Sequence, residues 1–179
     1  MSLDEIAYRQ AIAHFATGVT VVTTVADGRA AGMTASAVCS VSLQPVLLLI
    51  CISNRLPTHE ALQDSRRFVV NVLAEGDDDL ARRFATPAPD KFEGVALRAE
   101  FELPVLSDAM AYFVCDVHER FPGGDHSIFI GEVTDCGFDP GRKPLLYFRS
   151  GFGRIEEAEA YLQRDLASWE RISWPRRET

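Results

Sequence analysis

Hydroxyl groups gather in one uncharged stretch of the chain, Gly32 to Ser42, which reads GMTASAVCSVS. Thr34, Ser36, Ser40 and Ser42 supply side chains that both donate and accept hydrogen bonds. The residues between them are small, so a flat ligand would approach the backbone closely here. The same composition also suits two strands that pack tightly against their neighbours, and these residues alone leave both interpretations open.

The common catalytic and nucleotide-binding motifs do not occur in this sequence. There is no G-x-G-x-x-G after a strand, and G-x-x-x-x-G-K-[ST], G-x-S-x-G and H-E-x-x-H are all missing. The four histidines do not suggest a metal cluster, and the four cysteines include no C-x-x-C pair. We therefore expect no metal site, and a bound organic cofactor is the better candidate for any chemistry.

Size and charge narrow the class of protein further. The 179 residues and 19.8 kDa suit a single domain over 1–179. A net charge of −8 argues against a nucleic-acid partner. The N-terminus predicts no signal peptide, and the longest apolar run, Val46–Ile52, is shorter than the roughly 20 residues of a membrane span. We expect a cytoplasmic protein without a membrane segment, with small, buried and reduced cysteines at 39, 51, 115 and 136.

The elements that must position these groups are mainly strands. Alternating or β-branched patterns predict strands at 19–26, 30–36, 46–52, 68–73, 111–121, 127–138 and 145–148, with a poor edge strand at 103–106 that contains Pro104. Helical spacing predicts helices at 4–16, 59–64, 77–84 and about 155–171. The strands do not alternate with long helices, so we expect an antiparallel β-barrel or sandwich with peripheral helices.

Five segments follow one another in order over roughly residues 6–153. They are FATGVTV at 15–21, GMTASA with SVSL at 32–43, VNVL at 70–73, GDHSIFIGEV at 124–133 and PLLYFR at 144–149. Together they resemble the short-chain flavin reductases, the reductase components of two-component flavin-dependent monooxygenases. The resemblance implies a mainly β fold with peripheral helices, an antiparallel Greek-key split β-barrel that binds FMN.

The family implies an activity as well as a fold. A member binds FMN or FAD, reduces it with NADH or NADPH, and supplies reduced flavin by diffusion to a separate monooxygenase component. It also implies a homodimer, which the apolar runs at 19–25 and 46–52 favour. Two alternatives stay open: a split-barrel reductase of another acceptor such as a corrin, and a module that binds flavin or haem without turnover. Because flavin accepts hydride directly, no residue is assigned as a catalytic acid or base.

The first group of site residues follows the small stretch. Backbone amides and hydroxyls around Met33, Thr34, Ala35 and Ser36 are expected to hydrogen-bond the pyrimidine edge of the flavin ring. The alternative for these residues is tight strand packing without a ligand.

A second group, Ser53, Asn54, Arg55 and Thr58, precedes or begins a short predicted helix. Hydroxyls, amides and the positive end of the helix dipole converge there, so this loop suits a phosphate. It departs from family members that carry more Ser or Lys in the same loop. The alternative for Thr58 is a simple helix cap.

Two aromatic or titratable residues complete the predicted site. Phe84, beside Arg82 and Arg83, is expected to flank the ribityl or adenine part of the flavin, or to pack in the core. The resemblance implies that His126 contacts the nicotinamide or the flavin, with Asp125 orienting it; the alternative is a surface turn histidine. The remaining histidines, at 14, 59 and 118, are expected on the surfaces of helices or strands.

Overall fold

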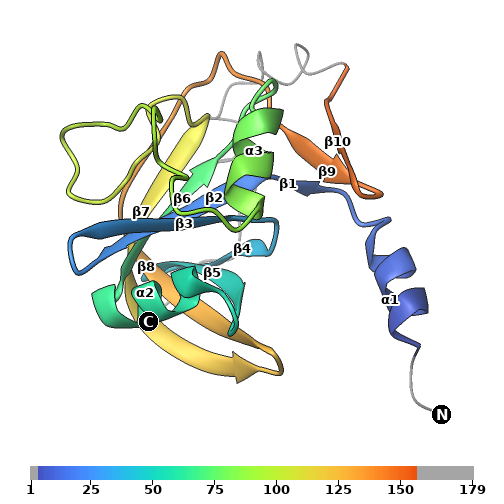
Figure 1. Ribbon diagram of the computed structural model, residues 1–179, viewed down its shortest axis with the longest axis horizontal. Helices are drawn as coiled ribbons and strands as arrows, with labels where there is room; N and C mark the ends of the chain where they lie inside the picture. Colours follow the sequence, from blue (N-terminus) through green and yellow to red (C-terminus); the bar gives the residue numbers. More distant parts are fainter. Residues whose placement is uncertain (1–3, 157–179) are drawn as a thin grey trace, which may run out of the picture.

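A computed structural model describes residues 4–156 (Figure 1). Its main feature is a seven-stranded sheet in the order β3-β2-β6-β7-β8-β5-β4, in which every pairing is antiparallel. The strands are β2 (Thr20–Ala26), β3 (Arg29–Ala35), β4 (Val38–Leu43), β5 (Val46–Ser53), β6 (Arg67–Val72), β7 (Ala111–Gly123) and β8 (His126–Phe138).

The β2–β3 hairpin forms as the sequence predicts. Asp27 and Gly28, the two turn residues, have φ angles of 50° and 72°. Such a turn matches the right-handed twist of the strands that it joins. The first five residues of β2, Thr20 to Thr24, are buried, so its apolar residues there are covered by the protein's own chain. The argument that the run at 19–25 exposes apolar surface for a dimer partner is therefore wrong.

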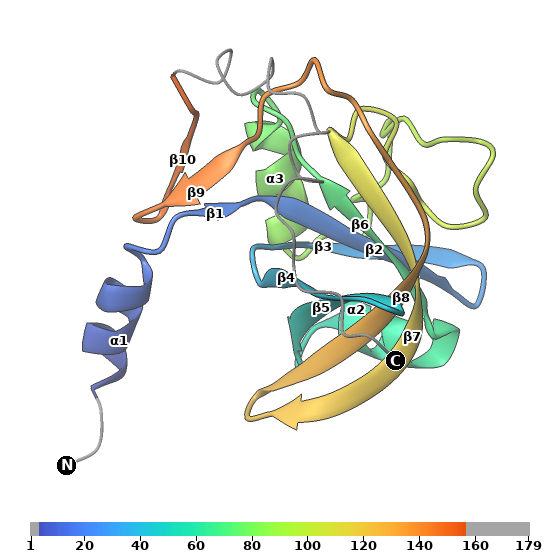
Figure 2. The ribbon, with the colours of Figure 1, turned by 180° about the vertical axis from the view of Figure 1, so that it is seen from behind.

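The two edges of the sheet approach each other where β3 ends and β4 begins. Only Ser36 and Ala37 separate these edge strands, and the amide of Cys51 in β5 donates to the carbonyl of Ala37 at 3.1 Å. The sheet therefore curls into a barrel that is closed at this corner and open elsewhere, as the views from both sides show (Figures 1 and 2). The enclosed core includes Val22, Ile50, Ile52, Leu62, Phe68, Val70, Cys115 and Phe129.

One glycine sets the packing inside this barrel. A Cβ added at Gly131 in β8 would lie 2.5 Å from Cζ of Phe68 and 2.9 Å from Cβ of Cys115. Real Cβ atoms do not approach other carbons so closely, so only glycine leaves room for the buried Phe68 ring at this position.

In the described part of the chain, three helices and a small second sheet surround the barrel. The helices are α1 (Glu5–Ile12), α2 (Pro57–Ser65) and α3 (Asp78–Ala85), and the small sheet holds β1 (Thr17–Gly18), β9 (Leu146–Phe148) and β10 (Gly151–Gly153). α1 stands away from the barrel and buries none of its residues (Figure 2). Within residues 4–156, no helix has the length and apolar character needed to cross a membrane.

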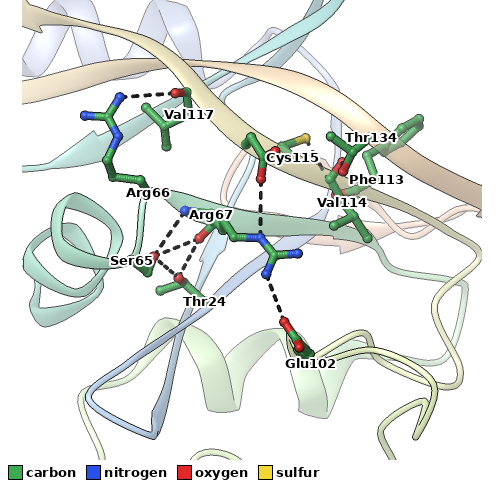
Figure 3. A network of polar contacts seen from close by, with 11 residues as sticks. Thr24, Ser65, Arg66, Arg67, Glu102, Phe113, Val114, Cys115, Val117 and Thr134 are labelled. Atoms are coloured by element: carbon green, nitrogen blue, oxygen red, sulfur yellow. Dashed lines mark hydrogen bonds and ion pairs between the residues drawn. The ribbon is translucent and has the colours of Figure 1, made fainter.

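The C-terminal end of α2 is joined to β2 and β6 by a polar network (Figure 3). The hydroxyls of Thr24 and Ser65 lie 2.6 Å apart, and both donate to the carbonyl of Arg67, at 2.6 and 2.9 Å. The Arg67 guanidinium also pairs with Glu102 at 3.1 Å and with Asp116 at 3.3 Å. This network fixes how the helix leaves the barrel.

Several elements differ from the sequence-based prediction. The segment 103–106 is not a strand, since only an isolated bridge joins Leu106 to Leu97. β4, β1 and β10 were not predicted as separate strands. Cys39 and Cys136 are exposed rather than buried, although none of the four cysteines forms a disulfide. The helix predicted at 155–171 lies outside the described residues, apart from its first two positions.

Candidate functional site

The free edge of β3 offers main-chain groups to a ligand. Nζ of Lys91 donates to the carbonyl of Gly32 at 3.3 Å, on the side of β3 that faces away from β2. Main-chain groups of alternate residues in a strand point the same way, so the N–H and C=O of Thr34 also face outward. The Thr34 hydroxyl is already engaged, because it donates to the carbonyl of Ala81 in α3 at 2.5 Å.

α3 lies against this edge because Gly32 has no side chain. A Cβ at Gly32 would lie 2.9 Å from Cε1 of Phe84 and 3.1 Å from Cζ of Phe92. These two rings meet edge to face, with centroids 5.0 Å apart, and Phe84 is only 1% exposed. Phe84 is therefore a core residue, as its alternative interpretation held, although it also lines the adjoining cavity.

Two cavities adjoin along the β3 edge and share Thr34 and Ala85. The larger, of about 520 Å³, is bounded by β3, the start of α2, the end of α3 and the loop that carries Lys91; we name it the Lys91 cavity. The smaller, of about 340 Å³, lies between β3, α3 and the small sheet; Arg82 lines it and gives it the name Arg82 cavity. The two cavities lie along the open main-chain groups of β3, and we refer to them together as the elongated groove.

The start of α2 is open toward the Lys91 cavity. The residue before the helix, Leu56, makes no side-chain cap, and Pro57 occupies the first turn. Thr58 follows inside the helix, so its interpretation as a helix cap is wrong. It is 4% exposed and lines the cavity, and its hydroxyl has no hydrogen-bond partner among residues 4–156. Pro57 has no N–H and the N–H of His59 donates to the carbonyl of Leu56 at 2.9 Å, so Thr58 supplies the open N–H and hydroxyl at this helix N-terminus, which favour an anion.

Lys91 adds a cation to the same cavity. Its Nζ donates to the carbonyls of Gly32 and Phe84, at 3.3 and 2.9 Å, and the ammonium has one further hydrogen to donate. Burial lowers the pKa of Lys91 from its ordinary value. Sequence reasoning missed this residue, because it follows a proline-rich loop and no motif marks it.

Ser53, Asn54, Arg55 and His126 form a second group rather than lining these cavities. Ser53 and His126 are paired in the β5–β8 ladder, and the amide of Asn54 donates to the carbonyl of Asp125 at 3.0 Å. The His126 ring is half-exposed, with Nδ1 2.7 Å from Oδ1 of Asp125. That hydrogen bond lowers the pKa of Asp125, with smaller help from the charges of His126 and Arg55. Asp125 thus orients His126, as the sequence predicts.

The first predicted group divides between the groove and the core. Thr34, Ala35 and Ser36 line the Arg82 cavity, and Thr34 also lines the Lys91 cavity with Met33. The side chain of Met33 packs against the barrel core, and Ala35 is 6% exposed and belongs to that core. By the alternation that turns the main-chain groups of Thr34 outward, those of Met33 and Ala35 face β2, so neither residue offers its backbone to a ligand in the groove. Within residues 4–156, no three His, Cys, Asp or Glu side chains gather as metal ligands.

The family of the chain follows from comparison with known sequences. Residues 12–156 match the model of the flavin reductase like domain. The chain belongs to the flavin reductase-like family. It is 42% identical over 153 residues to the reductase component of a 4-nitrophenol 4-monooxygenase/4-nitrocatechol 2-monooxygenase from Rhodococcus opacus, covering 86% of this chain and 82% of that relative.

Solved structures of flavin reductases share the fold. The NADH:FAD oxidoreductase SgcE6 of Streptomyces globisporus C-1027, in complex with NAD and FAD fragments, matches with a TM-score of 0.81 and 37% identity. That match covers 88% of this chain and 98% of the other. The flavin reductase PheA2 matches with a TM-score of 0.79 and 37% identity, over 87% of this chain and 100% of that one. The split-barrel fold predicted from the sequence is confirmed.

One histidine of this flavin reductase-like chain lies where the sequence did not place it. His59 is 6% exposed, whereas helical spacing suggested an exposed position. Its ring meets Phe129 at 5.6 Å between centroids, and its two nitrogens contact Ser127 and Gln63. The only signal in the sequence is its position one residue after Thr58 at a helix start, which does not distinguish the two faces of a short helix.

Proposed function

We propose that this chain catalyses the NADH-dependent reduction of FMN or FAD and releases the reduced flavin to a separate monooxygenase component. One observation carries the proposal: the outward main-chain groups of β3 border an elongated groove that ends at the open start of α2 and at Lys91. The names of the relatives support the reaction, since they include reductase components of monooxygenases and NADH:FAD oxidoreductases.

The residues present fit a flavin nucleotide. Its ring presents carbonyl and N–H groups along one edge, which complement the outward N–H and C=O of Thr34. Its phosphate end requires hydrogen-bond donors and positive charge, which Thr58, with its hydroxyl and main-chain N–H, and Lys91 supply. Small residues along β3 permit close approach of the ring, and Phe84 closes the wall behind them.

Bound flavin supplies an acceptor that takes hydride directly from the nicotinamide, so the protein acts mainly by positioning. In the proposed site, β3 holds the ring edge and the start of α2 holds the phosphate. His126, oriented by Asp125, contacts the nicotinamide or the flavin. Arg55 and Ser53 lie beside it on the same side of the barrel.

Anaerobic mixing of the protein with flavin and NADH tests the reaction. We expect the flavin absorbance to bleach when NADH is added to FMN or FAD, and no oxidation of NADH without flavin. Binding of flavin without bleaching by NADH or NADPH would contradict the enzyme and favour a binding module. Oxidation of NADH with a corrin in place of flavin would favour the remaining alternative, a split-barrel reductase of another acceptor.

A pair of glycine variants tests where the flavin binds. Gly32→Ala places a Cβ 2.9 Å from the Phe84 ring, so the ring must shift toward the Lys91 cavity that it lines. Gly153→Ala in β10 is the matched control, because a Cβ there meets nothing within 4 Å. We expect Gly32→Ala to weaken flavin binding by about tenfold or more, and Gly153→Ala to bind like the wild type. Equal flavin affinities in the two variants would indicate that the flavin binds away from Gly32.

We also propose that the protein is a homodimer whose partner copy covers α1 and β4. Apolar side chains on and just after these elements are open to solvent in one protomer: Ile6 of α1 is 66% exposed, Phe15 after α1 71% and Leu43 of β4 80%. A groove of about 820 Å³ separates α1 from the barrel. A helix that stands off its own barrel with an exposed apolar face needs a covering partner.

Sedimentation of matched α1 variants tests the dimer. Ile12→Glu places a charge on the apolar face of α1, where Ile12 is 50% exposed. Gln10→Glu adds the same charge to an exposed polar position of the same helix. We expect a dimer for the wild type and Gln10→Glu, and a shift toward monomer for Ile12→Glu. A monomeric wild type at micromolar concentration would contradict the proposal.

A further inference from the structure

A chain of side-chain hydrogen bonds runs from β7 to the loop before α2. Arg120 donates to Oε1 of Gln63, and Nε2 of Gln63 lies 3.0 Å from Nδ1 of His59. Nε2 of His59 lies 2.8 Å from the Ser127 hydroxyl, which donates to Oδ1 of Asn54 at 2.9 Å. The chain thus connects a surface guanidinium to the predicted phosphate loop through a buried histidine.

The guanidinium sets the direction of every bond in this chain. Arginine has no acceptor, so the Gln63 oxygen must face Arg120 and the Gln63 amide nitrogen must face His59. Nδ1 of His59 therefore accepts, and its Nε2 carries the proton and donates to Ser127. The Ser127 proton is then free to reach the Asn54 oxygen. A protonated His59 would place an N–H against the amide N–H of Gln63, so the chain accommodates only the neutral ring.

The surroundings of His59 favour the same protonation state. The ring is buried against Phe129, and the charged groups that act on it are Arg120 from β7 and Glu60 from its own helix. Burial lowers the pKa of His59 first, Arg120 lowers it further, and Glu60 opposes them. His59 is therefore neutral at neutral pH, with its proton on Nε2.

The last bond of the chain decides which way Asn54 presents its carboxamide. Because the Asn54 oxygen accepts from Ser127, its NH₂ group lies on the side of the carboxamide turned away from Ser127. Asn54 is exposed, and this NH₂ has no partner among residues 4–156. Its main-chain amide is held by the carbonyl of Asp125, so the loop itself is anchored.

We propose that His59 is a positioning residue that, through Ser127, holds the amide nitrogen of Asn54 outward beside Arg55, where it donates to a phosphate of a bound nucleotide. The identity of the nucleotide rests on the proposed function: the phosphate belongs either to the flavin nucleotide or to the pyridine dinucleotide. In either case His59 acts at a distance, and Asn54 makes the contact.

A double-mutant cycle with three ligands tests this assignment. The measured quantities are the ratio of FMN to riboflavin affinity, which isolates the flavin phosphate, and the KM for NADH. We expect Asn54→Ala and His59→Leu each to lower one of these affinities by about tenfold, and the double variant to lower it no further. A fall in the FMN ratio assigns the flavin phosphate, and a rise in the NADH KM assigns the pyridine dinucleotide. Additive losses, or no loss in either quantity, would overturn the proposal.

Variants that keep the fold give a second readout. His59→Gln keeps a donor toward Ser127 but does not titrate, and His14→Gln on α1 is the matched control. The phosphate itself titrates near pH 6, so the informative quantity is the difference between wild type and His59→Gln. We expect the wild type to lose extra affinity as the pH falls through the pKa of folded His59, which lies below the ordinary value of about 6.5, and His59→Gln to lack that extra loss. Identical pH profiles would overturn the proposal.

Gln63→Glu tests the direction of the chain. In this variant the carboxylate accepts a hydrogen bond from Nδ1–H and so stabilises the protonated His59 ring. The loss of nucleotide affinity at acid pH should therefore begin at a higher pH than in the wild type. Nitrogen-15 shifts of the His59 ring should show a protonated Nε2 and a bare Nδ1 in the wild type at neutral pH. A protein that binds and reduces no flavin would refute the proposed function, whereas the wrong His59 tautomer in a protein that reduces flavin would refute only this inference.

Discussion

At its C-terminal end, α2 closes on Arg66, whose amide donates to the carbonyl of Leu62 at 3.1 Å in a left-handed conformation. The hydroxyls of Thr24 and Ser65 then bond the main-chain carbonyl of Arg67, where the chain enters β6 (Figure 3). At its N-terminal end, the same helix begins without a side-chain cap and leaves Thr58 open to a cavity.

The difference lies in where the polar groups are used. In the network at the C-terminal end, the hydroxyls donate hydrogen bonds to the protein's own main chain. Around the N-terminal end, the buried hydrogen bonds of His59 hold other side chains in place, and the donors nearest the cavity stay free. A protein leaves such donors unpaired at an anion-binding site, where a ligand completes them.

The largest expected effect on stability comes from the buried bonds at the N-terminal end. His59→Leu removes the donor to the hydroxyl of Ser127, which is 7% exposed and keeps only its bond to Asn54, and it removes the acceptor of Gln63. We expect a loss of roughly 2–3 kcal/mol in the free energy of unfolding, measured with urea. Ser65→Ala at the other end should cost at most about 1 kcal/mol, because Ser65 is only half-buried. Equal losses would remove the contrast between the two ends.

The same histidine should make stability depend on pH. Its folded pKa is lowered, so the unfolded chain binds the proton more readily, and the neutral ring stabilises the fold above the unfolded pKa of about 6.5. That contribution should disappear as the pH falls through the lower folded pKa. Urea unfolding of wild type and His59→Gln between neutral and acid pH measures it. We expect a steeper acid loss in the wild type, and parallel curves would contradict the lowered pKa.

A matched pair of threonine variants separates the two ends by function. Thr24 is fully buried and donates to Arg67, so Thr24→Val should cost about 1–2 kcal/mol of stability and leave flavin affinity unchanged. Thr58 has an open hydroxyl in the cavity, so Thr58→Val should lower flavin affinity about fivefold and leave stability nearly unchanged. Denaturation and flavin titration on both variants measure the four quantities. Loss of flavin affinity in Thr24→Val but not in Thr58→Val would instead place the ligand at the C-terminal end of α2.

Much of the barrel could be predicted because its signals are local. The turn at Asp27 and Gly28 and the alternation in 111–121 depend on neighbouring residues. The β2–β3 hairpin and β7 both formed as expected. β4 was missed because its exposed pattern carries little apolar periodicity. The segment at 103–106 was misassigned because Val105 and Leu106 are buried by packing in a loop, which an apolar run alone does not distinguish from a strand.

The site was harder to predict because it depends on contacts between distant segments. Thr34 and Thr58 were chosen for their hydroxyls, and the fold brings both to one cavity. Lys91 reaches that cavity across 59 positions of sequence, and His59 meets Ser127 across 68. No local pattern encodes either contact. The roles of the site residues toward flavin stay predictions.

The smallest expected effect is at the exposed part of the C-terminal network. Arg67 pairs with Glu102 and Asp116, but the three side chains are 45%, 88% and 57% exposed. Water screens such pairs, so Arg67→Met should cost at most about 1 kcal/mol in dilute buffer. In about 1 M salt the cost should vanish, because the screening length falls to about 3 Å.

The buried bonds of His59 offer the contrast, since the loss in His59→Leu should hardly change with salt. Urea unfolding of both variants at low and high salt therefore compares a screened network with a buried one. If Arg67→Met instead cost more than about 2 kcal/mol at both salt concentrations, its ion pairs would hold α2 as firmly as His59 does. The two ends of the helix would then differ in what they present to the cavity but not in how strongly they are held.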